Sequence, residues 1–355
     1  MNAPRAAPED YVQYLIASPR VVSAVEAGRV QPIRPNAPGH DAFTRLLTRL
    51  EPDTAALWAE VAPHASRPGG VLVLDDSTLD KPYAREMALV GHHWSGKHKD
   101  VVRGINLLTL LWTDGDALWP CDYRLLEPKP KKPEKPDAPA TAGPPEPKPK
   151  PAPRATKNDH FRDMLASAKA RGQEPRLVLF DSWYSSLENL KAVRGHGWQF
   201  LTRVKANRRV DPDRTGNRSI SEVNISAEGT WVHLEGFGMV KAFRIAPTNG
   251  DAEHWVTDDL AMDDAGRLAG SELAWGIKDY HRGLKQYTGV ERCQARLAKS
   301  QRNHVGFAIR AFVRLEWLRF STGLGWFEAK WQVVREAVRA YLANPLFTLP
   351  KRATA

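Results

Sequence analysis

The sequence predicts an α/β fold, and three observations support this prediction. Two short apolar runs, Val71–Leu74 and Leu177–Phe180, have the composition of buried β-strands, and each ends in an acidic residue. From Phe200 to Met262 short strand-like runs alternate with turns rich in Gly and Asn. The other long stretches carry apolar residues at helical spacing. We therefore expect a sheet flanked by helices, with a β-rich part inserted in it.

The acidic strand ends are the first candidate site. Asp75 and Asp76 follow the first apolar run, and Asp181 follows the second. In open α/β sheets, ligand-binding groups gather beyond the carboxyl ends of the strands. Two carboxylates brought together there could share a hard divalent cation such as Mg²⁺. The alternative is that each Asp only caps a turn, but the repeated pattern favours a metal site formed by Asp76 and Asp181.

The composition indicates a polyanionic partner. The chain has 51 Lys and Arg against 41 Asp and Glu, a net charge of +10, and nucleic acid is the commonest partner of such a surplus. The two cysteines, Cys121 and Cys293, support neither a disulfide framework nor a cysteine-rich zinc site. No apolar run approaches the roughly 20 residues of a membrane span, and the N-terminus lacks a signal-peptide pattern. These features predict an intracellular protein without a membrane partner.

Composition shifts divide the chain into regions. Eleven of the 27 prolines, interleaved with six lysines, lie between Glu127 and Arg154, which predicts a disordered linker. Asn158 is then a suitable N-cap for a helix, and Thr113–Asp116 reads as the turn of a β-hairpin. The predicted organisation is a helical region at 1–68, the first part of the core at 69–202 with a linker at 127–156, a β-rich insertion at 203–262, core completion at 263–320, and a C-terminal helix and tail at 321–355.

A basic helix is predicted over Leu273–Gln286. At 3.6 residues per turn, Lys278, Arg282 and Lys285 share one face, while Asp279 projects about 100° away from Lys278. A cationic face beside a metal site suits the positioning of a phosphodiester backbone. An ordinary solvated helix face is the alternative for this segment taken alone.

The ordered set of motifs resembles bacterial insertion-sequence transposases with a DDE triad, in the branch with the Y-R-E-K signature. The resemblance rests on the two strand–Asp units, the segment Asp181-Ser-Trp-Tyr-Ser-Ser, the β-rich insertion and the helix Trp275-Gly-Ile-Lys-Asp-Tyr-His-Arg-Gly-Leu-Lys-Gln286. It implies a ribonuclease-H-like mixed sheet flanked by helices, and two Mg²⁺ or Mn²⁺ ions that support cleavage and strand transfer at terminal inverted repeats. It further implies terminal-repeat and target DNA as partners, a homodimer on paired ends, and a cytoplasmic, nucleoid-associated location.

The catalytic positions follow from this resemblance. The family's first acid precedes Ser or Thr, which selects Asp76, and the second acid corresponds to Asp181. The signature Lys corresponds to Lys285, which places the family Glu at position 278, where this chain has Lys278. The nearest acid is Asp279, which becomes the third candidate. Two alternatives to an active transposase remain: an impaired or repurposed DNA-binding protein, and a nuclease of the same fold.

Several residues are predicted to contact DNA. The segment Gly91–Lys99 reads as a basic loop, because its histidines lack a fourth zinc ligand at a suitable spacing. Trp255 could stack on an extruded base, or it could pack in the insertion's own core. The full predicted set is Lys97, Lys99, Trp255, Lys278, His281, Arg282 and Lys285.

Overall fold

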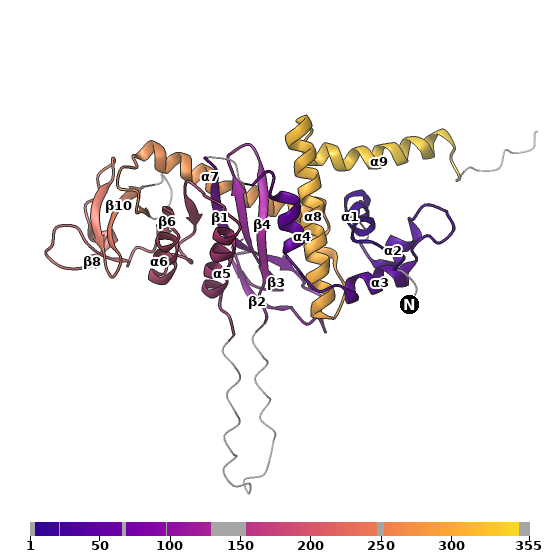
Figure 1. The fold of residues 1–355 in the computed structure, drawn as a ribbon, viewed down its shortest axis with the longest axis horizontal. Coiled ribbons are helices and arrows are strands. Elements are labelled where there is room, and N and C mark those ends of the chain that lie inside the picture. The colour runs from indigo at the N-terminus through magenta and orange to yellow at the C-terminus, as the bar shows by residue number, and fades with distance from the viewer. Residues whose placement is uncertain are drawn as a thin grey trace, which may run out of the picture.

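One sheet of mixed direction forms the centre of the molecule (Figure 1). The structure is a computed structural model, and it describes residues 4–20, 22–65, 69–96, 98–128, 154–246 and 252–347. The predicted linker therefore lies largely outside the described residues.

The core strands run in the order β4-β3-β1-β5-β6. The bounds of these strands and of β2 are β1 Val71–Asp80, β2 Gly91–Ser95, β3 Asp100–Thr113, β4 Leu118–Leu125, β5 Val178–Phe180 and β6 Phe200–Val204. β3 pairs antiparallel with β1, β2 and β4, whereas β5 is parallel to β1 and to β6. This mixed sheet flanked by helices is the ribonuclease-H-like architecture expected from the sequence.

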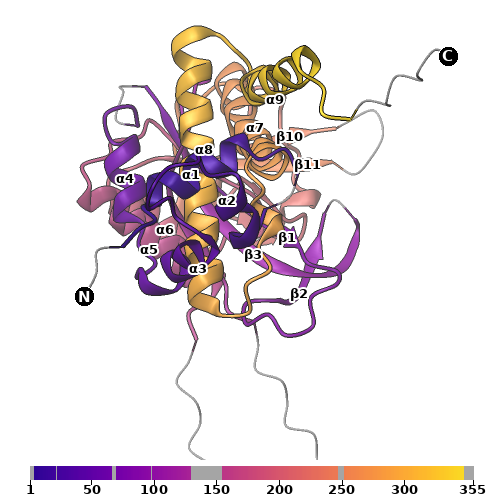
Figure 2. The same ribbon diagram turned by 90° about the vertical axis from the view of Figure 1, so that its right-hand side faces the viewer.

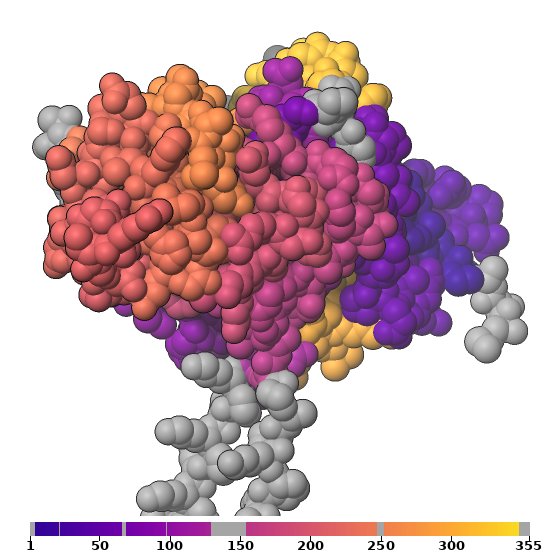
Figure 3. Space-filling view, turned by 60° about the vertical axis from the view of Figure 1, so that its left-hand side comes forward, coloured from indigo at the N-terminus to yellow at the C-terminus, as the bar shows by residue number. Residues whose placement is uncertain are grey.

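The β-rich insertion continues this sheet. Its strands are β7 Arg209–Asp211, β8 Arg218–Ser219, β9 Thr230–Leu234, β10 Gly238–Ile245 and β11 Glu253–Thr257, and a short 3-10 turn, Ile220–Glu222, follows β8. β11 pairs antiparallel with β6, so the ladder of hydrogen bonds passes from the core into the insertion without a break. In the space-filling view the insertion and the segment with α5 and α6 form one continuous surface (Figure 3).

Helices surround the sheet. They are α1 Pro8–Ala17, α2 Ala24–Arg29, α3 His40–Arg49, α4 Ala55–Val61, α5 Lys157–Ala170, α6 Leu187–Gly195, α7 Asp264–Tyr287, α8 Ala298–Thr322 and α9 Trp326–Ala343, with a 3-10 turn at Val290–Arg292. The N-terminal helices α1, α3 and α4 pack on α8 (Figure 2). None of the helices within the described ranges combines the length and the apolar character needed to cross a membrane.

α5 and α7 cover opposite faces of the core sheet. Phe161 of α5 makes an edge contact with Phe180, their ring centroids lying 5.0 Å apart. On the other face Gly270 of α7 lies so close to β6 that an added Cβ would sit 2.6 Å from Leu201. Because successive side chains of a strand point to opposite faces, odd-numbered residues of β1 face α7 and even-numbered ones face α5.

A buried histidine joins the N-terminal helices to the end of α7. The Nε2 of His304 on α8 lies 3.1 Å from the carbonyl of Gly289, and its Nδ1 lies 3.0 Å from the Tyr11 hydroxyl. If Nε2 carries the proton and donates to the carbonyl, Nδ1 must accept from the hydroxyl, which requires the neutral imidazole. Burial lowers the pKa of His304 to about 4, so the neutral form is the one present near pH 7.

Most predicted elements are confirmed, and two details are corrected. The hairpin around Thr113–Asp116 joins β3 to β4 as expected. The basic loop was a wrong prediction for Gly91–Ser95, because these residues form strand β2 along the first half of β3. Helix α5 begins earlier than predicted, since Thr156 is its N-cap: its hydroxyl accepts from the N–H of Asp159, and the Asp159 carboxylate accepts from the N–H of Thr156.

Candidate active site

The acidic pair of β1 projects to both faces of the sheet. Asp75, an odd-numbered residue, faces α7, and Asp76 faces α5. Both carboxylates are largely buried, with exposed side-chain fractions of 10% for Asp75 and 18% for Asp76. Buried carboxylates need hydrogen-bonding or ionic partners, and the two residues find them on different elements.

Asp76 is held by three donors. Its Oδ2 accepts from the Nζ of Lys157 at 2.8 Å and from the amide of Asn106 at 2.6 Å, and its Oδ1 accepts from the Tyr184 hydroxyl at 2.5 Å. Burial alone would raise the pKa of Asp76, but the Lys157 ammonium and the neighbouring donors outweigh it and lower that pKa. Burial and the Asp76 carboxylate raise the pKa of Tyr184, so its hydroxyl remains a donor. Asp76 is therefore a fixed anion.

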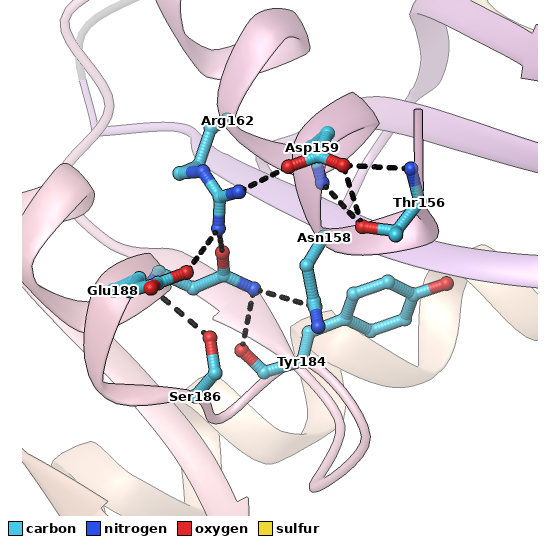
Figure 4. A network of polar contacts seen from close by, with 8 residues as sticks. Thr156, Asn158, Asp159, Arg162, Tyr184, Ser186 and Glu188 are labelled. Carbon is cyan, nitrogen blue, oxygen red and sulfur yellow. Dashed lines mark hydrogen bonds and ion pairs between the residues drawn. The ribbon is translucent and has the colours of Figure 1, made fainter. Parts of the chain in front are cut away.

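A polar network positions Tyr184 (Figure 4). The amide of Asn189 donates to the carbonyl of Tyr184 at 3.0 Å and to the side chain of Asn158 at 2.9 Å. Arg162 of α5 donates to Asn189 at 3.0 Å and to Glu188 at 3.2 Å, which ties α5 to α6. The Tyr184 ring points away from this network (Figure 4), and its hydroxyl donates to Asp76.

Asp75 is paired with a lysine of α7. The Nζ of Lys278 donates to its Oδ2, and the Lys278 side chain is 52% exposed. Burial raises the pKa of Asp75 to about 6, and the nearby charges of Asp76 and Asp181 act in the same direction, while Lys278 opposes them. Position 278 therefore faces the acidic strand, and the residue there is a cation.

Asp181 stands directly after β5, next to β1 in the sheet. Phe180 is in register with Leu74, so Asp181 follows at the level of Asp75. Its Oδ1 accepts from the N–H of Trp183 at 2.9 Å, which closes a tight turn. The charges of Asp75, Asp76 and Asp181 all act on Tyr184, so the three carboxylates gather around one region of the sheet.

The comparison with protein families agrees with this arrangement. A family described as "DDE superfamily endonuclease" matches residues 9–219, which is more than half of the chain. The chain belongs to the DDE superfamily endonucleases. The matched range contains Asp76 and Asp181 and ends before α7, so it does not include position 278.

Two solved structures resemble this DDE endonuclease distantly. One is the piggyBac transposase synaptic complex with hairpin DNA, at 11% identity and a TM-score of 0.48, covering 100% of this chain and 78% of that chain. The other is the Drosophila P element transposase strand transfer complex, at 8% identity and a TM-score of 0.28, covering 98% of this chain and 88% of that chain. No curated protein sequence was found to match.

Endonucleases of this family generally use divalent metal ions. Carboxylate oxygens are suitable ligands for Mg²⁺, but both oxygens of Asp76 already accept hydrogen bonds, and Asp75 is paired with Lys278. Across the described part of the chain, no group of three or more His, Cys, Asp or Glu residues is arranged to hold a metal. The acidic cluster of this DDE endonuclease carries its own ammonium groups, so it does not fit a pair of metal ions as it stands.

Asp279, the third acid candidate, lies elsewhere. Its carboxylate pairs with Arg282 on the same helix at 2.9 Å. It lines a hollow with Trp275, Arg319 and Trp326, whereas Lys278, one residue earlier, contacts Asp75. The structure therefore brings position 278, not Asp279, to the acidic strand of this DDE endonuclease.

The predicted DNA-contact residues are dispersed. His281 is 6% exposed, and burial together with Lys278 and Lys285 lowers its pKa to about 3, so a neutral, buried imidazole is not available to a phosphate here. Lys285 donates to the carbonyl of Thr78 at 2.6 Å.

Trp255 is half-buried against the core, and its Nε1 donates to Glu253 at 3.2 Å, which agrees with the packing alternative. Lys99 and Arg282 are exposed, while Lys97 lies outside the described residues.

Sequence reasoning missed the groups that hold Asp76. Lys157 and Asn106 reach it from positions 81 and 30 residues away in the sequence. Neither belongs to a motif, and only the sheet register and the packing of α5 bring them together. Tyr184 could have been found, because it lies in the Asp181-Ser-Trp-Tyr segment that carries part of the family resemblance.

Proposed function

We propose that the chain is an insertion-sequence DDE transposase that binds terminal inverted repeats and target DNA as a homodimer, in the cytoplasm at the nucleoid. The family's cleavage and strand-transfer chemistry would use two Mg²⁺ or Mn²⁺ ions, with Asp76 and Asp181 as ligands. In this chain we propose that cleavage is weak or absent. The protein therefore acts chiefly as a DNA-binding transposase.

The contact between Lys278 and Asp75 carries this proposal. A family transposase places a carboxylate at position 278, which would add negative charge beside Asp75, Asp76 and Asp181. Here an ammonium lies there instead and neutralises Asp75. Two unit charges about 4 Å apart interact by roughly 4 kcal/mol at an effective dielectric of 20, so a cation and this ammonium would compete strongly.

A cleavage assay tests the proposal. DNA carrying the repeats that flank the coding region is incubated with Mg²⁺ or Mn²⁺ and either the natural chain or the Lys278→Glu variant. We expect little cutting by the natural chain and a gain of cutting by Lys278→Glu, with Lys278→Gln as a control that removes the cation without adding an acid. Strong cutting by the natural chain that is lost in Asp279→Ala would instead establish Asp279 as the third acid.

A nuclease of the same fold is the second candidate. The net charge of +10 and membership of an endonuclease family support it equally well. The presence of inverted repeats around the coding region, and joining of cut ends to a second DNA by Lys278→Glu, would favour the transposase. Cutting without any joining would favour the nuclease.

A further inference from the structure

An exposed tryptophan stands beside the acidic cluster. Trp183 follows Asp181 by two residues, and its backbone N–H donates to that carboxylate at 2.9 Å. Its side chain is 60% exposed although the neighbouring Tyr184 is fully buried. Single exposed apolar residues are common on protein surfaces, so the significance of Trp183 depends on the charged groups and the hollow around it.

Two ammonium groups lie near this indole. The Nζ of Lys157 lies 5.6 Å from its ring centroid, and the Nζ of Lys205 lies 6.0 Å from it. Lys157 is the same residue that donates to Asp76. Lys205 is exposed, and no acidic side chain within the described ranges forms an ion pair with it. The indole is thus close to one lysine that is bound to the acidic cluster and to a second lysine that is free to bind an anion.

The surface next to the indole is hollow and basic. A cavity of about 540 Å³ is lined by Trp183, Lys205, Arg208 and Arg209, with Glu235 as its acidic member. Aromatic faces bind nucleotide bases by stacking, and lysine and arginine bind the phosphates that join them. The combination suits a nucleotide strand better than a protein partner, because it offers one stacking face with a surplus of cations.

We propose that Trp183 and Lys205 form a nucleotide clamp that holds one DNA strand beside the acidic cluster. Trp183 stacks on a base, and Lys205 binds the adjoining phosphate. The clamp rests on the proposed DNA-binding function and adds to it the residues that fix the strand next to Asp76 and Asp181. It assigns base stacking to Trp183, which sits at the acids, in place of Trp255, which packs against the core.

The test measures DNA binding, not cleavage. The full chain is titrated into a fluorescent duplex of arbitrary sequence that carries a single-stranded extension, and into a second probe with 2-aminopurine in that extension. Stacking energies of about 1–3 kcal/mol per base correspond to an expected 5- to 150-fold loss of affinity in Trp183→Ala, together with loss of 2-aminopurine quenching. Trp183→Phe should retain most of both signals.

Matched variants separate the clamp from general charge and folding effects. Trp331→Ala removes another exposed tryptophan, on α9 at the opposite end of the molecule from the insertion (Figure 1), and should leave affinity unchanged. Lys205→Ala should make the slope of log affinity against log salt concentration less steep by about 1, the amount expected for the loss of one phosphate contact. Lys241→Ala, which removes a lysine 5.7 Å from the Phe243 ring, should not change the slope. Circular dichroism of each variant establishes that it is folded.

The outcomes are distinguishable. If the natural chain binds neither probe, the proposed DNA-binding function fails and the clamp with it. If the natural chain binds but a folded Trp183→Ala variant keeps its affinity and its quenching, only the clamp is overturned. An equal loss in Trp331→Ala would also overturn it, since the effect would then not be specific to the indole beside Asp181.

Discussion

Replacing Lys278 by Glu should make the stability of the folded protein depend on a bound divalent cation. In the natural chain the Lys278 ammonium neutralises the buried Asp75 carboxylate. The variant loses the attraction between Lys278 and Asp75 and gains a repulsion between the new Glu and Asp75. Each of these interactions is roughly 4 kcal/mol for unit charges about 4 Å apart at a dielectric near 20. Because the Lys278 side chain is 52% exposed, solvent screens most of this, and we expect a net loss of about 1–3 kcal/mol of unfolding free energy without metal.

Thermal unfolding measured in EDTA and in excess Mn²⁺ checks this reasoning. Lys278→Glu should melt below the natural chain in EDTA and recover as Mn²⁺ is added, because a ligand that binds only the folded state stabilises it. Lys278→Gln removes the ammonium without adding a carboxylate, so it should gain little from Mn²⁺. Equal stabilisation of all three proteins by Mn²⁺ would refute the idea that position 278 controls cation binding.

Three further outcomes follow from the contacts around the site. The pKa of His304 is lowered from 6.5 in the unfolded chain to about 4 in the folded protein, so between these pH values only the unfolded chain binds the proton. The free energy of unfolding should therefore fall as the pH decreases from 6.5 to about 4, by about 3 kcal/mol in all. Urea midpoints across this range should vary less in His304→Gln, and an unchanged slope would contradict the assignment. Tyr184→Phe leaves one oxygen of Asp76 without its donor and should cost about 1–2 kcal/mol in urea unfolding; equal stability would show that water replaces the hydroxyl. Asp279→Ala, introduced into Lys278→Glu, should leave the Mn²⁺-dependent gain intact, whereas loss of that gain would make Asp279 a ligand.

The sequence could predict the acidic strands because their signal is local. Four apolar residues followed by an acid describe a buried strand and its end, and the structure has β1 and β5 at those positions. β5 ends at Phe180 as predicted, but β1 continues past Asp75 and Asp76 to Asp80, so the prediction of a strand end there was wrong. The strand period of two also implies that Asp75 and Asp76 face opposite sides. What it could not supply is the identity of the helix on each side, since that depends on how α5 and α7 pack over the sheet.

The basic segment around β2 shows a different limit. His92, His93 and Trp94 lack the alternating apolar pattern of a half-buried strand, and glycines flank them. The segment is nevertheless a strand, because the long β3 offers free backbone groups beyond its pairing with β4. Edge strands of this kind are fixed by their neighbour's hydrogen bonds, which no local propensity reveals.

The unbroken ladder from β5 through β6 to β11 limits how the insertion can move. A domain attached through loops could swing as a hinged arm and then dock, but a strand paired along its length cannot rotate without breaking several hydrogen bonds together. The insertion and Asp181 therefore belong to one continuous sheet and should move together. Any DNA bound to the insertion would therefore meet the acidic cluster at a distance and angle fixed by the fold. The number of base pairs between a recognised sequence and the reactive phosphate would then be set by the strand pairing of the sheet.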